Sequence, residues 1–343
     1  METLASNLDR VTAEHAFNLL LATAGLAFTY LLAWEIGHSR RAAALAMAAM
    51  AVMPAVIAHS RNNPKDVATL LIFPLTFLLL LRAVRKPGLL RMALAGIVLG
   101  ISLNTRIFSV ALIPLFALLL AIRWPALLRQ RIGQLIVIGS VAAAIAILLW
   151  PWLWLEAPLD QLARVGELIA TKLGVQFQVL YLDEMQLWTE IPWHFPLFHL
   201  LASLPLSLML LAAVPILATL LGKLRRPESF DLVLAGALWI GVLLAWDLIA
   251  PARYDGMRHY LAVLVGLSLL VGAGGDWLLA WLEDRRPFGL DRLAANRLGW
   301  TLVGSLIALA GWECIQIHPY QSAYLNPVAS ALGGEQSDEW VEV

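Results

Sequence analysis

The chain has 343 residues, of which 60% are hydrophobic and only 14% are charged. Soluble domains carry about one quarter charged residues, so this composition, with a mean hydropathy of +0.77, predicts a protein that crosses a membrane several times. The 24 basic residues balance the 24 acidic ones, which argues against a nucleic-acid partner. A single cysteine, Cys314, excludes an internal disulfide and a thiolate metal cluster.

Ten apolar segments follow one another along the chain and set the predicted architecture. Apolar runs of about 17 to 25 residues match a hydrocarbon core roughly 30 Å thick. We therefore expect an all-α, polytopic transmembrane bundle of about 8 to 10 membrane segments, organised as a single domain over 1–343. The segments lie at 16–34, 42–58, 67–81, 92–104, 107–122, 132–155, 200–221, 231–250, 259–281 and 299–317.

The fourth and fifth segments, 92–104 and 107–122, are short for complete spans. A helix of 13 residues, the length of the fourth segment, rises only about 20 Å. The two segments form either two spans or a re-entrant pair around Asn104, Thr105 and Arg106. Both interpretations cross the membrane an even number of times, so the later connections keep the same sidedness.

The Lys and Arg residues distribute unevenly between alternate connections. One set of connections holds 16 of them and the other set holds 8. Cytoplasmic connections carry the excess of basic residues, so the first set is expected to be cytoplasmic and both ends of the chain as given to lie outside. The first set comprises 35–41, 82–91, 123–131, 222–230 and 282–298.

Three polar motifs and one long connection fall on the outer side. The motifs are HSRNNPKD at 59–66, PARYDGMRH at 251–259 and HPYQSAYLNP at 318–327. The stretch WLWLEAPLDQLARVGELIATKL leads into the long connection 156–199, and its apolar and polar residues alternate at helical spacing. This pattern predicts an amphipathic helix along the membrane interface. Polar chemistry is therefore expected on the outer face.

The motif at 59–66 has a structural and a functional interpretation. Asn63, Pro64 and Asp66 suit a helix start, with an N-cap, a proline at the first helical position and a carboxylate facing the positive helix end. Groups that can carry positive charge beside one carboxylate also suit an anionic headgroup such as a phosphate, although a solvated loop of mixed charge has the same composition. Three residues carry such groups here: His59, Arg61 and Lys65.

The second motif places Arg253, Asp255, Arg258 and His259 within seven residues, at the entry of a predicted span. Asp255 and the glycine after it form an ordinary turn signal. The two arginines oppose the usual distribution of positive charge, and they suit either a lipid-linked phosphate or lipid headgroups reached by long side chains. Asp247, near the outer end of the eighth segment, is a further candidate because carboxylates are rare within spans.

Aromatic residues are frequent near the outer side. His318, Tyr320 and Tyr324 follow the last segment, and tryptophans such as Trp193 flank the long connection. Aromatic side chains of this kind form belts at membrane interfaces. Sugars also stack on such rings, so a belt and a substrate site are both compatible with the pattern.

The order of these motifs resembles a known family. HSRNNPKD, WPWLWLEAPLDQL, VLYLDEM followed by IPWHFP, YDGMRHYLAVL and HPYQSAYLNPVASALGG are similar to motifs of bacterial membrane proteins of glycosyltransferase family 39. These belong with the protein mannosyltransferases and the lipid A aminoarabinose transferases in the GT-C fold. The resemblance extends over nearly the whole chain. It implies an inverting transferase of the bacterial inner membrane that moves a hexose or pentose from a polyprenyl-phosphate donor to a lipid, glycan or protein acceptor at the periplasmic face.

The resemblance also implies roles for individual residues. Membrane lipids would surround the protein as partners, and a divalent cation such as Mg, Mn or Zn is a candidate cofactor. Asp66 and His59 are the candidate ligands of that cation. The implied catalytic residues are Asp66, His59 and Asp255. The donor phosphate would be held by Arg61, Lys65, Arg106, Arg253, Arg258 and His259. The substrates would contact His318, Tyr320, Tyr324, Asn326, Trp193 and His194.

One feature departs from the family pattern. Family members begin with a further span and a first outer loop carrying an Asp-Glu pair, whereas this sequence opens with only Asp9 and Glu14 as comparable acids. The outer C-terminal segment 318–343 also ends where relatives continue, so a truncated form lacking its catalytic base is expected. Two other functions stay open. A degenerate, non-catalytic homologue is one, and a transporter or flippase for a lipid-linked anion is the other, although most segment centres lack the polar residues of a transport path.

Overall fold

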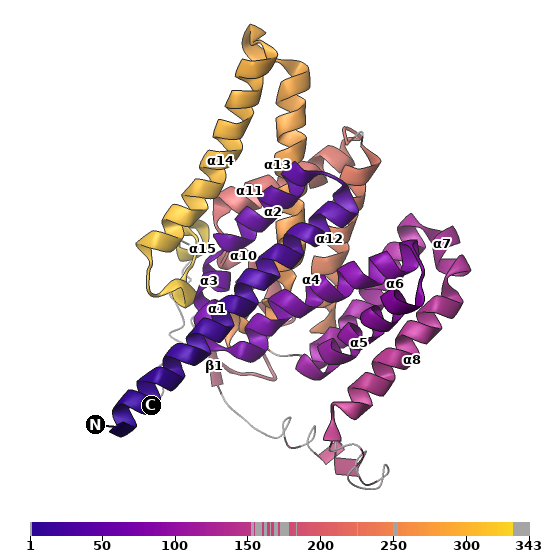
Figure 1. Ribbon diagram of the computed structural model, residues 1–343. Coiled ribbons are helices and arrows are strands. Elements are labelled where there is room, and N and C mark those ends of the chain that lie inside the picture. Colours follow the sequence, from indigo (N-terminus) through magenta and orange to yellow (C-terminus); the bar gives the residue numbers. More distant parts are fainter. Residues whose placement is uncertain are drawn as a thin grey trace.

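The computed structural model describes residues 2–331 except 152–153, 155–159, 161–162, 165, 168–170, 172–177, 183, 225, 250 and 252. The described part is a bundle of helices with one small β-hairpin (Figure 1). The all-α, polytopic architecture predicted from the sequence is confirmed. The interfacial helix predicted within 152–173 falls largely outside the described residues.

The first four helices pack against one another. Their bounds are α1 (Glu2–Gly37), α2 (Arg40–Ala51), α3 (Pro54–Asn62) and α4 (Pro64–Arg85). The axis bends by 61° between α2 and α3, where Pro54 stands at the first position of α3. A proline removes a backbone donor and fixes φ, so it begins the new helix at the break. The predicted second segment is therefore broken into two helices at this point.

The next helices form a second group, seen beside α4 in Figure 1. Their bounds are α5 (Leu89–Thr105), η1 (Ile107–Ala111), α6 (Leu112–Arg123), α7 (Pro125–Gln130) and α8 (Ile132–Leu148). The helix α5 packs against both α4 and α8. The short 3-10 helix η1 separates α5 from α6 at the point where the sequence predicted a break around Asn104 to Arg106.

The remaining elements begin within the long connection 156–199. They are β1 (Gln178–Tyr181), β2 (Glu184–Leu187), α10 (Phe195–Ala202), α11 (Leu206–Leu220), α12 (Pro227–Trp246), η3 (Gly256–Tyr260), α13 (Val263–Arg285), η4 (Pro287–Gly289), α14 (Arg292–Gln316), η5 (Gln321–Ala323) and α15 (Pro327–Ala331). The antiparallel strands β1 and β2 pair Tyr181 with Glu184 across the turn, and they add one small hairpin to the helical architecture. The chain turns by 112° between α10 and α11.

The helices carry the apolar length that a membrane requires. Within the described residues, five helices are long and apolar enough to cross a membrane, and the number rises to seven if each bent pair forms one span. Three shorter apolar helices, α5, α6 and α8, cover the remaining predicted segments. All ten apolar segments predicted from hydropathy thus coincide with helices, and the chain is a multi-pass membrane protein.

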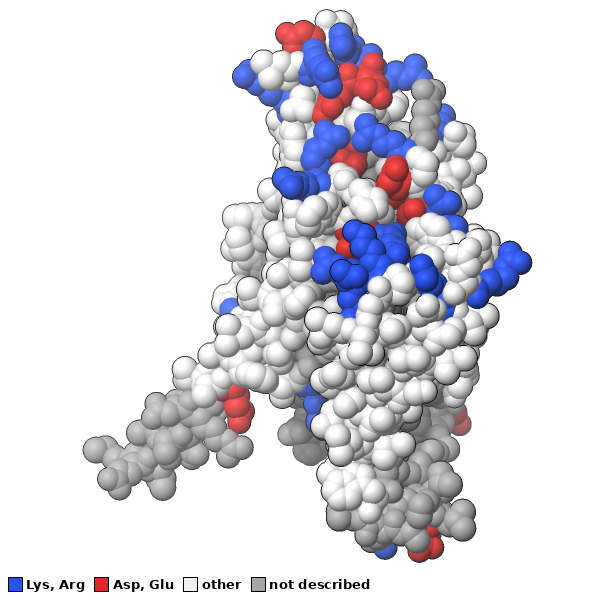
Figure 2. Space-filling model, turned by 45° about the vertical axis from the view of Figure 1, so that its right-hand side comes forward, with Lys and Arg blue, Asp and Glu red and all other residues white. Residues whose placement is uncertain are grey.

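The two ends of the bundle differ in their charged residues. We call the end where α4 finishes the basic end, because Arg82 and Arg85 lie there and pair with Glu35 at 3.0 and 3.1 Å. Figure 2 shows Lys and Arg gathered over this upper part, above a broad uncharged surface. The opposite end, where α4 begins at Pro64, is called the site end. The 22 residues of α4 separate the two ends by about 30 Å.

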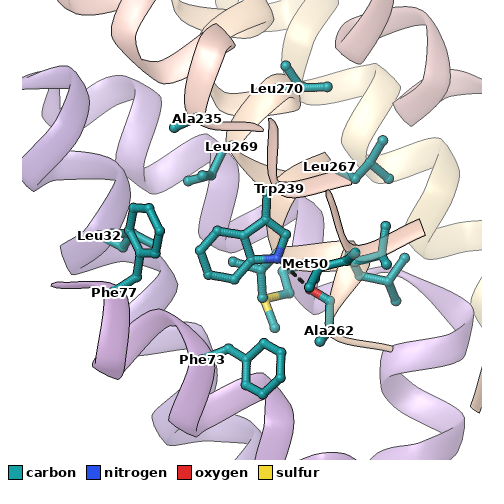
Figure 3. Packing of buried hydrophobic residues seen from close by; sticks show 14 of the residues in the cluster. Leu32, Met50, Phe73, Phe77, Ala235, Trp239, Ala262, Leu267, Leu269 and Leu270 are labelled. Carbon is teal, nitrogen blue, oxygen red and sulfur yellow. Dashed lines mark hydrogen bonds between the residues drawn. The ribbon is translucent and has the colours of Figure 1, made fainter. Parts of the chain in front are cut away.

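A buried aromatic cluster holds the central helices together. Trp239 of α12 is fully buried and donates from its indole nitrogen to the carbonyl of Ala262 at 2.9 Å. Phe73 and Phe77 of α4 lie beside it, and the centroid of the Phe77 ring is 5.2 Å from that of Trp239 (Figure 3). These contacts join α4, α12 and the start of α13, and thereby fix the positions from which the site-end loops emerge.

Glycines allow α13 to lie close to its neighbours. A Cβ atom placed at Gly274 would lie 1.9 Å from the carbonyl oxygen of Leu211 on α11. At Gly236 of α12, a Cβ atom would lie 2.8 Å from the carbonyl oxygen of Gly266 on α13. Small residues let helix backbones approach in membranes, where close packing replaces the hydrophobic effect as the main source of association.

The start of α4 is capped as the sequence predicted. The side-chain oxygen of Asn63 accepts a hydrogen bond from the backbone N–H of Lys65 at 3.1 Å, Pro64 is the first helical residue, and Asp66 lies in the first turn. We expect Asn63→Ala to lower the free energy of unfolding by about 1 kcal/mol, because one N–H at the helix start loses its partner. Thermal unfolding in detergent measures this change. Asn63→Asp, which restores a cap, should recover wild-type stability, and an unchanged melting temperature for the alanine variant would contradict the capping role.

Candidate functional site

The centre of the site end is a carboxylate held between two arginines. Asp66 is 0% exposed, and its Oδ2 accepts from Arg258 Nε at 2.7 Å. Its Oδ1 lies 2.6 Å from Arg106 Nη1. Asp66 belongs to the first turn of α4, Arg106 lies between α5 and η1, and Arg258 lies on η3. Three segments distant in sequence therefore meet at one buried charge.

A second carboxylate extends this cluster toward solvent. Asp255 is 34% exposed, and its Oδ2 accepts from Arg258 Nη1 at 2.7 Å. Asp255 and Gly256 both have positive φ, at 54° and 49°, which agrees with the turn predicted from the Asp-Gly pair. Arg258 therefore bridges two carboxylates of different exposure. Burial alone would lower the pKa of its guanidinium, but the hydrogen bond and the charge of Asp66, together with Asp255, raise that pKa.

His259 and Tyr254 complete the cluster around the arginines. Arg106 Nη2 donates to His259 Nδ1 at 3.1 Å, and His259 Nε2 lies 3.7 Å from Asp255 Oδ2. The Tyr254 ring meets the His259 ring edge to face, with centroids 4.5 Å apart. Burial and then the negative charge of Asp255 raise the pKa of the Tyr254 phenol, so it stays neutral at physiological pH. Tyr254 did not stand out in the sequence, although it directly precedes Asp255.

The first and third motifs reach the same end of the bundle. The helix α3, which carries His59, packs against both η3 and η5. The charges of Asp66, Arg258 and Asp255 all act on His59. The three outer motifs predicted from loop parity to share a face are thus neighbours.

Arg61 and Lys65 differ from the arginines of the cluster. Both are exposed, and neither makes an ion pair with any residue that the structure describes. The carbonyl of Arg61 accepts from the Asn18 side chain at 3.1 Å, which ties α3 to α1 and leaves the guanidinium at the surface. These two side chains can therefore meet an anion without breaking an internal ion pair.

Arg253, also predicted to hold a phosphate, is engaged elsewhere. Its Nε donates to Asp247 Oδ2 at 2.8 Å, and its Nη1 donates to the carbonyl of Ile191 at 2.7 Å. Asp247 is buried and also accepts from the Tyr260 hydroxyl at 2.7 Å. Burial and then Asp247 raise the pKa of this phenol. This network ties the end of α12 and η3 to the connection that follows the hairpin, and the phosphate role of Arg253 stays a prediction.

We expect Asp247→Asn to destabilise the site end by about 3 kcal/mol, because it leaves the largely buried Arg253 without its anion. Protease cleavage near the β-hairpin should become faster, and the melting temperature should fall. Glu228→Gln is a matched control, since Glu228 is exposed in the first turn of α12 at the basic end. Equal protease resistance of the Asp247 variant and the control would rule out this anchoring role.

The terminal motif mostly makes hydrogen bonds within the protein. Asn326 is buried, and its amide donates to the carbonyls of Leu201 and Leu204 at 2.7 and 3.0 Å. The Tyr324 hydroxyl donates to Glu313. Gln321, absent from the predicted set, donates to His318 Nδ1 at 2.8 Å and also to the carbonyl of Cys314. These bonds fasten the end of α14 to the corner between α10 and α11, whereas Tyr320 is 70% exposed.

Trp193 and His194 lie in the connection that enters α10. Trp193 is 63% exposed, so its ring can meet a membrane surface or a sugar. His194 Nδ1 shares a hydrogen bond of 2.8 Å with the Tyr181 hydroxyl on β1. Burial raises the pKa of Tyr181 to about 12, so its hydroxyl keeps its proton at physiological pH. His194 therefore links the hairpin to α10.

Asp66 and His59 were the predicted ligands of a metal ion. The part of the chain that the structure describes contains no group of three or more His, Cys, Asp or Glu side chains arranged to hold one. Both oxygens of Asp66 face guanidinium groups, whereas a bound divalent cation needs carboxylate oxygens turned toward it. Asp66 and His59 therefore do not fit a metal site in this arrangement.

Comparison with known proteins identifies the first part of the chain. Residues 9–152 match the family model described as dolichyl-phosphate-mannose-protein mannosyltransferase. A search of curated proteins found no match. The matched range includes Asp66 and Arg106, and Arg258 of the same cluster lies beyond it. Residues 9–152 thus match a family of membrane glycosyltransferases of the GT-C type.

Proposed function

We propose that the protein transfers a sugar from a polyprenyl-phosphate donor to a lipid, glycan or protein acceptor at the site end of the bundle. The observation that carries this proposal is the convergence of Arg106 and Arg258 on Asp66, with Asp255 beside them. A phosphate leaving group needs positive charge near its oxygens, and the guanidinium group of arginine forms paired hydrogen bonds to phosphate. The family domain at 9–152 supports the reaction class.

In the proposed reaction, a hydroxyl of the acceptor attacks the anomeric carbon while the bond to the lipid phosphate breaks. The leaving phosphate gains negative charge in the transition state, and fixed cations stabilise that charge. Arg258 and Arg106 are the cations that provide this stabilisation from inside the cluster. The exposed Arg61 and Lys65 attract the donor phosphate from the membrane surface.

Asp255 is the carboxylate best placed to accept the proton of the attacking hydroxyl. It is one-third exposed, and among the described residues only its Oδ2 has hydrogen-bond or ion-pair partners. Asp66 has no exposed surface and faces an arginine with each oxygen. We assign Asp255 as the general base and Asp66 as the residue that positions both arginines. His59, partly exposed in the same field of charges, is assigned to hold the acceptor.

The basic end is proposed to face the cytoplasm. Membrane proteins keep their excess of Lys and Arg on that side, and the site end has half as many basic residues in its connections. The site would then lie at the periplasmic face of a bacterial inner membrane. A cysteine introduced at Tyr320, which is exposed at the site end, should react in intact cells with a membrane-impermeant thiol reagent.

A transfer assay tests the proposed function. The full chain is reconstituted in liposomes with a panel of polyprenyl-phosphate sugars, and sugar transfer to added lipid, glycan and peptide acceptors is followed. We expect turnover with at least one donor, and a rate about 100-fold lower for Asp255→Asn, since general bases contribute roughly 100-fold or more. Glu228→Gln at the basic end should keep the wild-type rate. Absence of turnover with every donor in the folded protein would refute the proposal.

A further inference from the structure

The basic end contains a cavity that is remote from the site end. Its volume is about 620 Å³, within the range of small-molecule sites. It lies between the connection from α11 to α12 and the C-terminal half of α13. Charged and aromatic side chains line much of it, namely Lys223, Arg226, Asp276, Trp277, Trp281 and Arg285.

The unpaired charges of the cavity are mainly positive. Lys223, Arg226 and Arg285 are exposed, and none of them makes an ion pair with a residue that the structure describes. Asp284, which also lines the cavity, is the one carboxylate of its wall without an ion pair in the described part of the chain. The wall therefore carries more cations than anions around an open space.

The remaining carboxylate of the cavity, Asp276, shares Arg41 with Glu283. Asp276 has a side chain that is 5% exposed, and its Oδ1 lies 3.0 Å from Arg41 Nε on α2. Arg41 Nη1 donates to Glu283 at 2.7 Å, and the Asn296 amide donates to the same Glu283 oxygen. The floor of the cavity is thus fixed by a network from α2, α13 and α14. This network carries one net negative charge, which is smaller than the net positive charge of Lys223, Arg226, Arg285 and Asp284 in the wall.

Apolar and aromatic side chains lie at and beside the cavity. Trp277 and Trp281 stack with centroids 6.3 Å apart, and the Trp281 ring is partly exposed. Leu220 and Leu221, at the end of α11 just before the cavity, are 77% and 64% exposed. Tryptophans prefer the boundary between hydrocarbon and headgroups. A ligand with a charged head and an apolar tail matches both parts of this surface.

We propose that this cavity binds the phosphate-bearing headgroup of an anionic phospholipid, with the acyl chains along Leu220 and Leu221. Basic pockets between helices at the cytoplasmic side recognise such headgroups, because several cations meet one phosphate close to the hydrocarbon boundary. This assignment is independent of the proposed transfer reaction, which takes place at the other end of the bundle. The bound lipid would fasten α13 to the connection between α11 and α12.

Nanodiscs of defined composition test the proposal. The full chain is placed in phosphatidylcholine with and without a minor fraction of phosphatidylglycerol, and retained lipid is measured together with the melting temperature. We expect preferential retention of phosphatidylglycerol and a higher melting temperature when it is present. Each basic residue near an anionic surface contributes roughly fivefold, so the combined substitutions Lys223→Gln, Arg226→Gln and Arg285→Gln should weaken retention about 100-fold.

A matched variant separates a site from general attraction to an anionic membrane. The substitutions Arg129→Gln, Arg292→Gln and Arg297→Gln also remove three exposed cations of the basic end, but outside the cavity. We expect this control to retain phosphatidylglycerol as the wild type does. Equal weakening in both triple variants would overturn the proposal. Displacement of the lipid by millimolar inorganic phosphate, with equal protection by phosphate alone, would also overturn it in favour of a soluble anion.

Discussion

Arg258→Gln is expected to reduce sugar transfer about 100- to 1000-fold, the effect of removing one group that stabilises transition-state charge. Arg258 contacts Asp66 and Asp255 at 2.7 Å each, so it both carries charge toward the leaving phosphate and holds the proposed base in place. Initial rates in proteoliposomes with saturating donor measure the loss. Arg258→Lys should recover only part of the rate, because an ammonium group lacks the planar pair of donors that bridges the two carboxylates.

A structural explanation of that loss can be tested separately. Removing Arg258 alone leaves the buried Asp66 with only Arg106 as its ion-pair partner among the described residues, which costs stability. The double variant Asp66→Asn with Arg258→Gln removes both charges and should regain part of the melting temperature while staying inactive. Arg292→Gln at the basic end serves as the charge-matched control. A transfer rate for Arg258→Gln within twofold of wild type would exclude the phosphate role.

Gly274→Leu is expected to prevent stable folding, with a loss above about 4 kcal/mol, beyond the usual range for overpacking. The first added carbon would lie 1.9 Å from the carbonyl oxygen of Leu211, and a backbone atom cannot rotate away as a side chain can. α11 and α13 would have to separate along their contact. The yield of monodisperse protein in detergent and its melting temperature measure the effect.

Gly304→Leu provides the control for this substitution. Gly304 is exposed on α14, and nothing lies within 4 Å of a Cβ atom placed there. Leucine favours a helix more than glycine does, so without a steric contact the substitution should leave the free energy of unfolding unchanged or raise it. This variant should therefore fold as well as the wild type. Similar yields for both leucine variants would show that α11 and α13 are not packed as described.

Much of the fold follows from hydropathy alone. Each of the ten apolar segments coincides with one helix or with a bent pair of helices, and Pro54 and Pro64 mark helix starts that their chemistry predicts. The hairpin at β1 and β2 was not predicted, because its strands QVLY and EMQL have only four residues each and give a weak local pattern. Short strands gain stability from their partner, which a local pattern does not contain.

The site was predictable in its position but not in its pairings. The alternation of the apolar segments placed the three motifs on one face, and α3 does pack against both η3 and η5. Arg253 and Arg258 belong to one loop and looked equivalent in the sequence. In the structure, Arg258 pairs with Asp66, which is 192 residues away, whereas Arg253 pairs with Asp247. Contacts over such separations depend on how the helices cross, and residue type alone does not determine that crossing.

The ion pairs around Asp66 make donor binding an exchange reaction. The two carboxylates and two guanidinium groups of Asp66, Asp255, Arg106 and Arg258 balance one another in charge. An incoming phosphate therefore competes with these carboxylates for the same guanidinium groups. Donor affinity and catalytic rate should consequently separate on Asp255→Asn, since the substitution removes one competitor for Arg258 and, with it, the proposed base.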